Sequence, residues 1–123
     1  MADHSPRFLK LVESIRPSIK ECDIHHVQHR LERKERFLLI DVREESEWSK
    51  GHLSGAIHLG KGIIERDIEK AVPNPATEVI LYCGGGFRSA IAAEALARMG
   101  YTHVVSMDGG YRAWCDAGFP IVR

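Results

Sequence analysis

The residues best suited to chemistry in this sequence stand together in one short segment that begins with a cysteine. The segment consists of Cys83, Gly84, Gly85, Gly86, Phe87, Arg88 and Ser89. Because glycine has no side chain, three in a row let the chain curl tightly, so that successive backbone N–H groups point inward at an anion. A cysteine thiolate is a strong nucleophile, and the nearby charge of Arg88 favours it. The segment therefore predicts nucleophilic chemistry on an anionic substrate, centred on Cys83.

Two regular elements are expected on either side of this segment. Residues 79–82 form a continuous apolar run, which is typical of a strand buried on both faces. Residues 88–99 are rich in alanine with apolar residues on one side, and Gly100 stands where the resulting helix would end. Ligands of open parallel sheets bind beyond the carboxyl ends of the strands, and the positive N-terminal end of a helix favours an anion there. Cys83 is expected in such a position.

The rest of the chain shows the same alternation of short apolar runs and helical patterns. Further extended segments are expected near residues 22–24, 37–40, 56–59 and 103–106, and further helices near residues 6–15, 26–33, 44–50, 62–71 and 109–114. This alternation predicts an α/β domain in three layers, with a mainly parallel central sheet flanked by helices. We expect residues 1–20 to form an N-terminal helical extension and residues 21–123 to form the domain.

The composition is that of an ordinary globular protein without a marked charge. The chain has 123 residues, of which 44% are hydrophobic and 28% charged, and 17 basic residues balance 17 acidic ones. A net charge near zero gives no electrostatic reason to expect nucleic acid or an anionic membrane as a partner. No apolar stretch approaches the roughly 18 residues of a membrane span, and the polar N-terminus does not resemble a signal peptide. We therefore expect a cytoplasmic protein.

The cysteines outside the central segment are interpreted as structural. Three cysteines, widely separated, favour free thiols in a reducing compartment over a disulfide framework. Cys115 is expected to be a buried apolar residue of the last helix. Cys22 stands near three histidines, His25, His26 and His29, whose spacing could align zinc ligands. Because Cys22 is expected before the helix that carries them and no partner motif follows, a solvated helix face is the preferred interpretation.

A thiolate within a ring of N–H groups suits two reactions, and the residues themselves leave both open. Such a thiolate can attack phosphorus, as in cysteine phosphatases, or it can attack sulfur. A third interpretation is a small buried cysteine after a strand, followed by an ordinary glycine-rich turn. The combination of a strand, a cysteine, three glycines and an arginine at the start of a helix favours a functional site.

Three motifs of this sequence resemble those of the rhodanese family. They are Asp41-Val42-Arg43-Glu44 with Glu47-Trp48 and Gly51-His52-Leu53-Ser54-Gly55-Ala56, then the segment from Cys83 to Ser89, then Gly109-Gly110-Tyr111-Arg112-Ala113-Trp114 with Gly118 and Pro120. The resemblance extends from about Glu21 to the end of the chain, in the family's order and spacing. It implies a rhodanese-like fold and a thiosulfate sulfurtransferase of the rhodanese type.

The length of the loop bears on which reaction the resemblance favours. Four residues separate Cys83 from Arg88, which is the short form of the sulfurtransferases in this family. The related phosphatases of the same fold have one residue more, which widens the loop for a phosphate. The resemblance therefore favours attack on sulfur. A phosphatase or arsenate reductase is the less favoured alternative, and a protein-binding or sulfur-relay module with little thiosulfate turnover is another.

The resemblance also implies a mechanism and a set of roles. Cys83 would take the outer sulfur of thiosulfate or of a persulfide donor, and then pass it to a thiol, to cyanide or to a sulfur-acceptor protein. No metal and no organic cofactor would be needed. Substrate binding is expected from Gly84, Gly85, Gly86, Phe87 and Arg88, with Arg88 orienting the donor anion or holding the loop.

Other residues are expected to support this site without touching the substrate. Asp41 would accept N–H groups of neighbouring loops, Arg43 would pair with a carboxylate, and Ser89 would lie behind the cysteine. His52 is interpreted as a residue that holds a turn rather than as a general base for Cys83. Tyr111 and Trp114 are expected to pack in the core.

Overall fold

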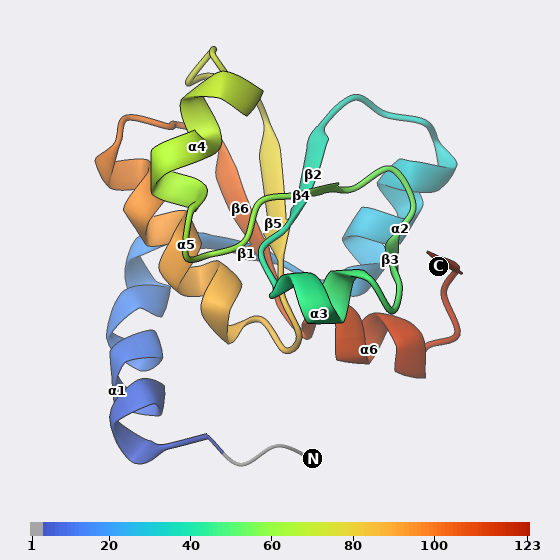
Figure 1. Cartoon of the computed structure of the whole chain (residues 1–123), viewed down its shortest axis with the longest axis horizontal. Coiled ribbons are helices and arrows are strands. Elements are labelled where there is room, and N and C mark those ends of the chain that lie inside the picture. The colour runs from blue at the N-terminus through green and yellow to red at the C-terminus, as the bar shows by residue number, and fades with distance from the viewer. Residues whose placement is uncertain (1–3) are drawn as a thin grey trace.

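A five-stranded parallel sheet forms the centre of the structure, a computed structural model that describes residues 4–123 (Figure 1). Its middle strand is β5 (Val79–Tyr82), a run of four apolar residues that are all buried. Each strand pairs in parallel with the next in the order β1 (Lys20–Cys22), β6 (Val104–Met107), β5, β2 (Leu38–Asp41) and β4 (Ile57–His58). The predicted α/β fold with a parallel sheet is confirmed.

Helices cover both faces of the sheet, because successive side chains of a strand point to opposite faces. On one face α4 (Ile64–Ala71) and α5 (Phe87–Arg98) pack on Val79 and Leu81; on the other α2 (Ile24–Glu32) and α6 (Gly110–Asp116) pack on Ile80 and Tyr82. Figure 1 shows the two helical layers on opposite sides of the strands. The three-layer prediction is confirmed, and Cys83 belongs to the α5 side.

The N-terminal segment forms α1 (Pro6–Ile15), which packs against α5. Proline occupies the first turn of α1, where its missing N–H costs no hydrogen bond, and Val12 and Ile15 are buried. A short 3₁₀ helix, η1 (Arg16–Ser18), then leads into β1 at the edge of the sheet. Part of the predicted extension, residues 1–3, lies outside the described residues. The division of the chain at residue 20 stays a prediction.

A small second sheet was absent from the sequence prediction, and several helices differ from it in their bounds. β3 (His52–Leu53) and β7 (Ile121–Val122) form an antiparallel pair of two residues each, too short for a periodic pattern. α3 (Glu45–Trp48) is a single turn within the predicted range 44–50. α2 begins two residues earlier than predicted, because Asp23 caps it by accepting the N–H of His26. None of the helices within residues 4–123 is long and apolar enough to cross a membrane.

Candidate active site

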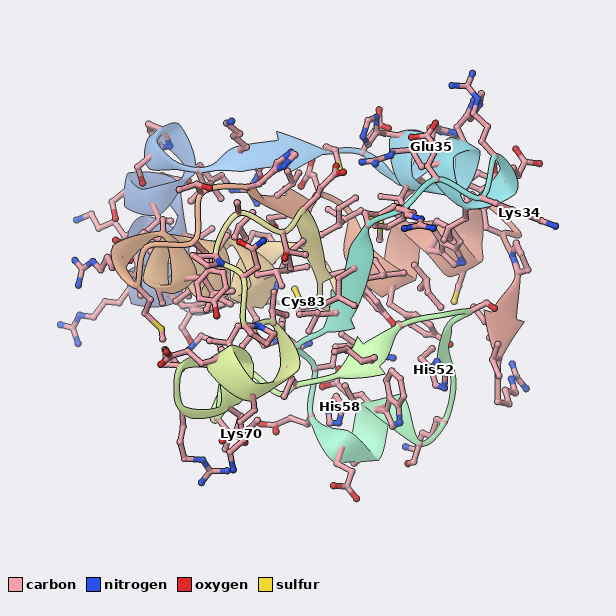
Figure 2. All side chains as sticks on the ribbon, turned by 90° about the horizontal axis from the view of Figure 1, so that it is seen from above. Lys34, Glu35, His52, His58, Lys70 and Cys83 are labelled. Atoms are coloured by element: carbon pink, nitrogen blue, oxygen red, sulfur yellow. The ribbon has the colours of Figure 1, made fainter. Side chains whose placement is uncertain are left out.

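The sulfur of Cys83 lies at the N-terminal end of α5, one residue beyond the last residue of β5. The residue is only 1% exposed, and Figure 2 shows it near the middle of the molecule. Backbone N–H groups of Gly86 and Ser89 donate to its Sγ atom, at 3.1 and 3.3 Å. Because the helix adds its positive end at the same point, the surroundings favour a negative charge on this sulfur.

The tight turn of the loop depends mainly on Gly86. Its φ of +96° lies in the left-handed region, which side chains disfavour. A Cβ atom there would also come within 3.2 Å of the Gly109 nitrogen and 3.3 Å of Oδ1 of Asp108. Gly84 and Gly85 have no positive φ, but both line the pocket beside the cysteine. Glycine at position 86 is therefore required by both the backbone and the packing.

The outer side of the loop is held by the start of α6. The N–H of Tyr111 donates to the Cys83 carbonyl at 2.8 Å, and that of Arg112 donates to the Gly84 carbonyl at 2.9 Å. In trans peptides the N–H points opposite to the preceding carbonyl, so the N–H groups of Gly84 and Gly85 face away from α6. Two otherwise unpaired N–H groups of one helix thus orient the N–H groups of the loop.

Close packing between α6 and the loop requires a glycine at position 110. A Cβ atom on Gly110, whose φ is +60°, would lie 2.5 Å from the Cys83 carbonyl oxygen. In the sequence this glycine stands out only as part of the Gly109–Trp114 motif. Its contact with the loop joins residues far apart in the chain, so local pattern could not reveal it.

Arg88 is hydrogen-bonded to the carboxylate of Glu47, a residue that was not predicted to belong to the site. Its Nη1 and Nη2 atoms donate to the two oxygens of Glu47, at 2.7 and 3.1 Å. The Arg88 guanidinium lowers the pKa of Glu47 below its ordinary value, and the carboxylate in turn raises the pKa of Arg88. Glu47 also accepts the N–H of Glu44 in a capping box at the start of α3, a local signal beside its place in the first motif.

Asp41 and Arg43 form a buried pair behind the site. Nε and Nη2 of Arg43 donate to the Asp41 carboxylate, and the Arg43 backbone N–H also donates to it, at 2.8 Å. Nη2 additionally donates to the Gly51 carbonyl at 2.7 Å, and the guanidinium lies 4.0 Å from the Tyr111 ring centre. Arg43 thus connects the end of β2 to the turn before β3 and to α6, the helix that holds the cysteine loop.

A short chain of hydroxyl groups runs inward from the cysteine. Sγ of Cys83 lies 3.5 Å from Oγ of Ser89, which is 2.8 Å from Oγ of Ser106 on β6. All three residues are buried. Ser89 contacts the sulfur with both its backbone N–H and its side chain, and its supporting role stays a prediction. Ser106 was not predicted, because a single serine in a strand carries no functional signal.

A pocket of about 410 Å³ opens beside the cysteine. It is lined by Glu47, Cys83, Gly84, Gly85, Phe87 and Arg88 from the loop and α3, with His4, Phe8 and Arg112 from outside them. Phe87 therefore forms a wall of the pocket. Asp41, Arg43 and Ser89 do not line it. The contributions of His4, Phe8 and Arg112 were absent from the sequence analysis, because they come from the two ends of the chain.

His52 lies apart from the cysteine, as Figure 2 shows. Its ring stacks on Trp48, with the ring centres 3.6 Å apart, and its Nδ1 atom is 3.0 Å from the Leu53 carbonyl oxygen. It stands at the turn that leads from α3 into β3. These contacts are those of a residue that holds a turn.

The other two cysteines have different surroundings. Cys22 ends β1, where burial chiefly, and then the charge of Asp23, raise the pKa of its thiol to about 12. Cys115 is exposed on α6, so the prediction that it is buried is wrong; the neighbouring Trp114 takes the buried side of the helix, as predicted. Tyr111 is half-buried against the same core. Within residues 4–123 no three His, Cys, Asp or Glu side chains are placed to hold a metal ion.

Known proteins with similar sequences share the region that builds this site. The family model for the Rhodanese-like domain matches residues 24–117. A sulfurtransferase from Allochromatium vinosum is 33% identical over 104 residues, which cover 85% of this chain and 95% of that protein. The thiosulfate sulfurtransferase PspE of Escherichia coli is 39% identical over 70 residues, or 57% of this chain and 67% of its own.

A solved structure extends the similarity to nearly the whole chain. It is that of a Rhodopseudomonas palustris protein of unknown function, described as a possible tyrosine phosphatase. Its TM-score is 0.84 at 27% sequence identity, and the match covers 99% of both chains. The shared fold therefore includes the N-terminal helix as well as the sheet.

Proposed function

Because this chain belongs to the family of rhodanese-like domains and its relatives include sulfurtransferases, we propose that Cys83 carries a sulfur atom as a persulfide. The observation that carries the proposal is the position of its sulfur, which accepts N–H groups of Gly86 and Ser89 at the end of α5. A group that receives such donors holds negative charge well, both as a thiolate and as a persulfide. The site thus suits a covalent intermediate.

The reaction proceeds in two displacements. The Cys83 thiolate attacks the outer sulfur of a donor such as thiosulfate; a new S–S bond forms, the S–S bond of the donor breaks, and its electron pair leaves with sulfite. A thiol, cyanide or an acceptor protein then attacks the outer sulfur of the persulfide, and Cys83 leaves as the thiolate. Electrons balance without a metal or an organic cofactor. The N–H groups of Gly84 and Gly85, directed away from α6, are available to the transferred sulfur.

Thiosulfate as the donor is supported by the relative from Escherichia coli, which is a thiosulfate sulfurtransferase. In this chain the proposed binding residues for a donor are those of the loop, Gly84 to Arg88. Asp41 and Arg43 would act through the loop and α6, because they lie behind the pocket. Three free thiols suit a reducing compartment such as the cytoplasm, which we propose as the place of action.

A phosphatase is the second candidate, because the Rhodopseudomonas palustris neighbour is described as a possible tyrosine phosphatase. Only four residues separate Cys83 from Arg88, and the Arg88 guanidinium is bonded to Glu47. Both features reduce the room and the positive charge offered to a phosphate. Hydrolysis of p-nitrophenyl phosphate that is lost in Cys83→Ser would favour the phosphatase over the sulfurtransferase.

Intact-mass measurement after incubation with thiosulfate tests the proposal directly. The wild type is expected to gain one sulfur atom, which cyanide or a thiol removes, whereas Cys83→Ser should gain none. Cys115→Ser is the matched control, because it removes an exposed thiol and should load like the wild type. If neither thiosulfate nor an organic persulfide loads Cys83, sulfur transfer is excluded, and a binding module of the same fold becomes the better description.

A further inference from the structure

Three aromatic rings form one wall of the pocket, which we call the aromatic wall: His4 just before α1, Phe8 on α1 and Phe87 at the start of α5. The ring centre of Phe87 lies 4.4 Å from that of His4 and 6.1 Å from that of Phe8. The guanidinium of Arg16, the residue that follows α1, lies 5.4 Å from the centre of the Phe87 ring. Figure 1 shows the N-terminal end of α1 and the β5–α5 loop at the same end of the molecule.

Two of these rings come from outside the family region. The matched residues are 24–117, whereas His4 and Phe8 precede them. Val12 and Ile15 are buried and α1 packs against α5, which holds Phe8 against the pocket. His4 and Phe8 therefore add to a pocket whose other lining residues all lie within the region that the family model matches.

The charge of the pocket suits a monoanion. Glu47 neutralises Arg88 through two hydrogen bonds, so this guanidinium is not free for a divalent anion. Arg112, which is exposed, adds a positive charge at the rim. Thiosulfate carries two negative charges, and a pocket with one uncompensated cation matches it poorly.

The size and lining of the pocket suit an organic group. Its volume of about 410 Å³ falls within the range of roughly 300–1,000 Å³ that is typical of sites for small organic molecules. Thiosulfate is a small inorganic ion and offers no surface to three aromatic rings. An aryl group in this space would contact them edge to face or in an offset stack.

We propose that the aromatic wall selects donors whose transferable sulfur is carried on an apolar, preferably aromatic, organic group with a single negative charge. This inference rests on the proposed sulfur transfer and names its substrate class. For an arylthiosulfonate, the Cys83 thiolate bonds to the terminal sulfur, the S–S bond of the donor breaks, and the electron pair leaves with the arylsulfinate. No further reactant is required.

Two donors of equal charge and chemistry test the wall. Benzenethiosulfonate and methanethiosulfonate differ only in the organic group, and thiocyanate formed from cyanide reports the transfer. We expect Phe8→Ala to lower the ratio of kcat/KM values, benzene over methane, by about threefold to tenfold, which is the usual contribution of an aromatic contact. Leu11→Ala is the matched control, since Leu11 lies on the same helix, is 49% exposed and does not line the pocket.

Comparing ratios between variants cancels the intrinsic difference in reactivity of the two donors. Phe8→Leu, which keeps the bulk and the helix, is a second variant and should lower the ratio in the same direction. An unchanged ratio in both variants, with thermal unfolding like that of the wild type, would overturn the aromatic wall as a selector. Loading of Cys83 by thiosulfate but by neither thiosulfonate in intact-mass spectra would overturn the proposed donor class alone, whereas loading by none of the three would overturn sulfur transfer itself, so the two failures are distinguishable.

Discussion

Cys22 and Cys83 occupy similar places in the sheet yet have opposite surroundings. Each stands at the carboxyl end of a parallel strand, and each is followed by a helix. At α2 the N–H of the third residue, His26, donates to the carboxylate of Asp23. At α5 the N–H of the third residue, Ser89, donates to the sulfur of Cys83. The anion position at the start of the helix is taken by aspartate in one case and by cysteine in the other.

The consequence for the two thiols follows from this difference. Beside Cys22, burial is the main cause that raises the pKa to about 12, and the carboxylates of Asp23, Glu21 and Asp108 add to it. Beside Cys83, the backbone N–H groups of Gly86 and Ser89 face the sulfur, and the nearby cation, Arg88, is paired with Glu47. A strand end alone therefore does not surround a cysteine with N–H donors; the residues that follow it decide.

The largest effect should come from displacing the loop around Cys83. We expect Gly110→Ala to slow sulfur loading by about a hundredfold, because its Cβ atom would push the Cys83 carbonyl from its place by roughly 1 Å. Gly118→Ala is the control: its φ is +75°, but no atom lies within 4 Å of the added Cβ. Loading rates from intact-mass time courses, with thermal unfolding alongside, separate displacement from general backbone strain. Equal losses in both variants would contradict the role of α6.

A smaller change in activity is expected from removing the carboxylate that pairs with Arg88. Glu47→Gln keeps the acceptor for the Glu44 N–H but removes the carboxylate, so kcat/KM for thiosulfate should rise by about threefold to tenfold. Glu45→Gln removes the same charge from the same helix without touching Arg88 and should have little effect. Thiocyanate formation measures both, and a fall in Glu47→Gln would show that the ion pair is needed to hold the loop.

The Glu47–Arg88 pair also has a predictable pH dependence. Its contribution to folding is present above pH 4.5, the ordinary pKa of Glu47, and is lost as the pH falls through the lowered pKa of the folded state. Unfolding by urea between pH 3 and 6 should therefore show a steeper acid loss in the wild type than in Glu47→Gln. Parallel profiles would contradict the pair as a source of acid sensitivity.

The hydroxyl chain behind Cys83 should matter less than the backbone donors. Ser89→Ala removes the Oγ atom 3.5 Å from Sγ but leaves the Ser89 N–H in place. We expect loading to slow by about twofold to fivefold, the effect of one weak hydrogen bond. Ser14→Ala, an exposed serine that bonds only within its own helix, is the control. A loss as large as that of Gly110→Ala would mean that the hydroxyl, rather than the N–H groups, activates the cysteine.

The smallest expected effects concern the titration of Cys22 and its contribution to stability, and they appear only at alkaline pH. Because the folded pKa of about 12 exceeds the ordinary 9.0, Cys22 stabilises the fold below pH 9, and this contribution is lost as the pH rises toward 12. Asp23→Asn keeps a capping side chain but removes a charge, so it should lower the titration midpoint of Cys22. Thiolate absorbance in a chain lacking Cys83 and Cys115 measures the midpoint, with Asp116→Asn as the control. An unmoved midpoint would contradict the contribution of Asp23.

Local pattern was enough to predict the fold and the centre of the site. The apolar run of β5 and the alanine-rich α5 are continuous in sequence, and their alternation with the other elements predicts a parallel sheet. Cys83 and the glycines after it are likewise consecutive, so their geometry follows from a tight turn into a helix. The start of α2 was misplaced because its cap, Asp23, acts through a single side chain. The exposure of Cys115 was mispredicted because one short helix gives little periodicity to decide which side is buried.

By itself the sequence determined that Cys83 stands in a turn of N–H groups between a strand and a helix, since those residues are neighbours in the chain. Only the tertiary structure decided what surrounds that turn. Glu47 reaches Arg88 across 41 residues, α6 holds the loop carbonyls, and the N-terminal helix brings Phe8 to Phe87. Each of these contacts depends on how separate elements pack against one sheet, and apolar periodicity shows which face of an element is buried but not which distant element covers it.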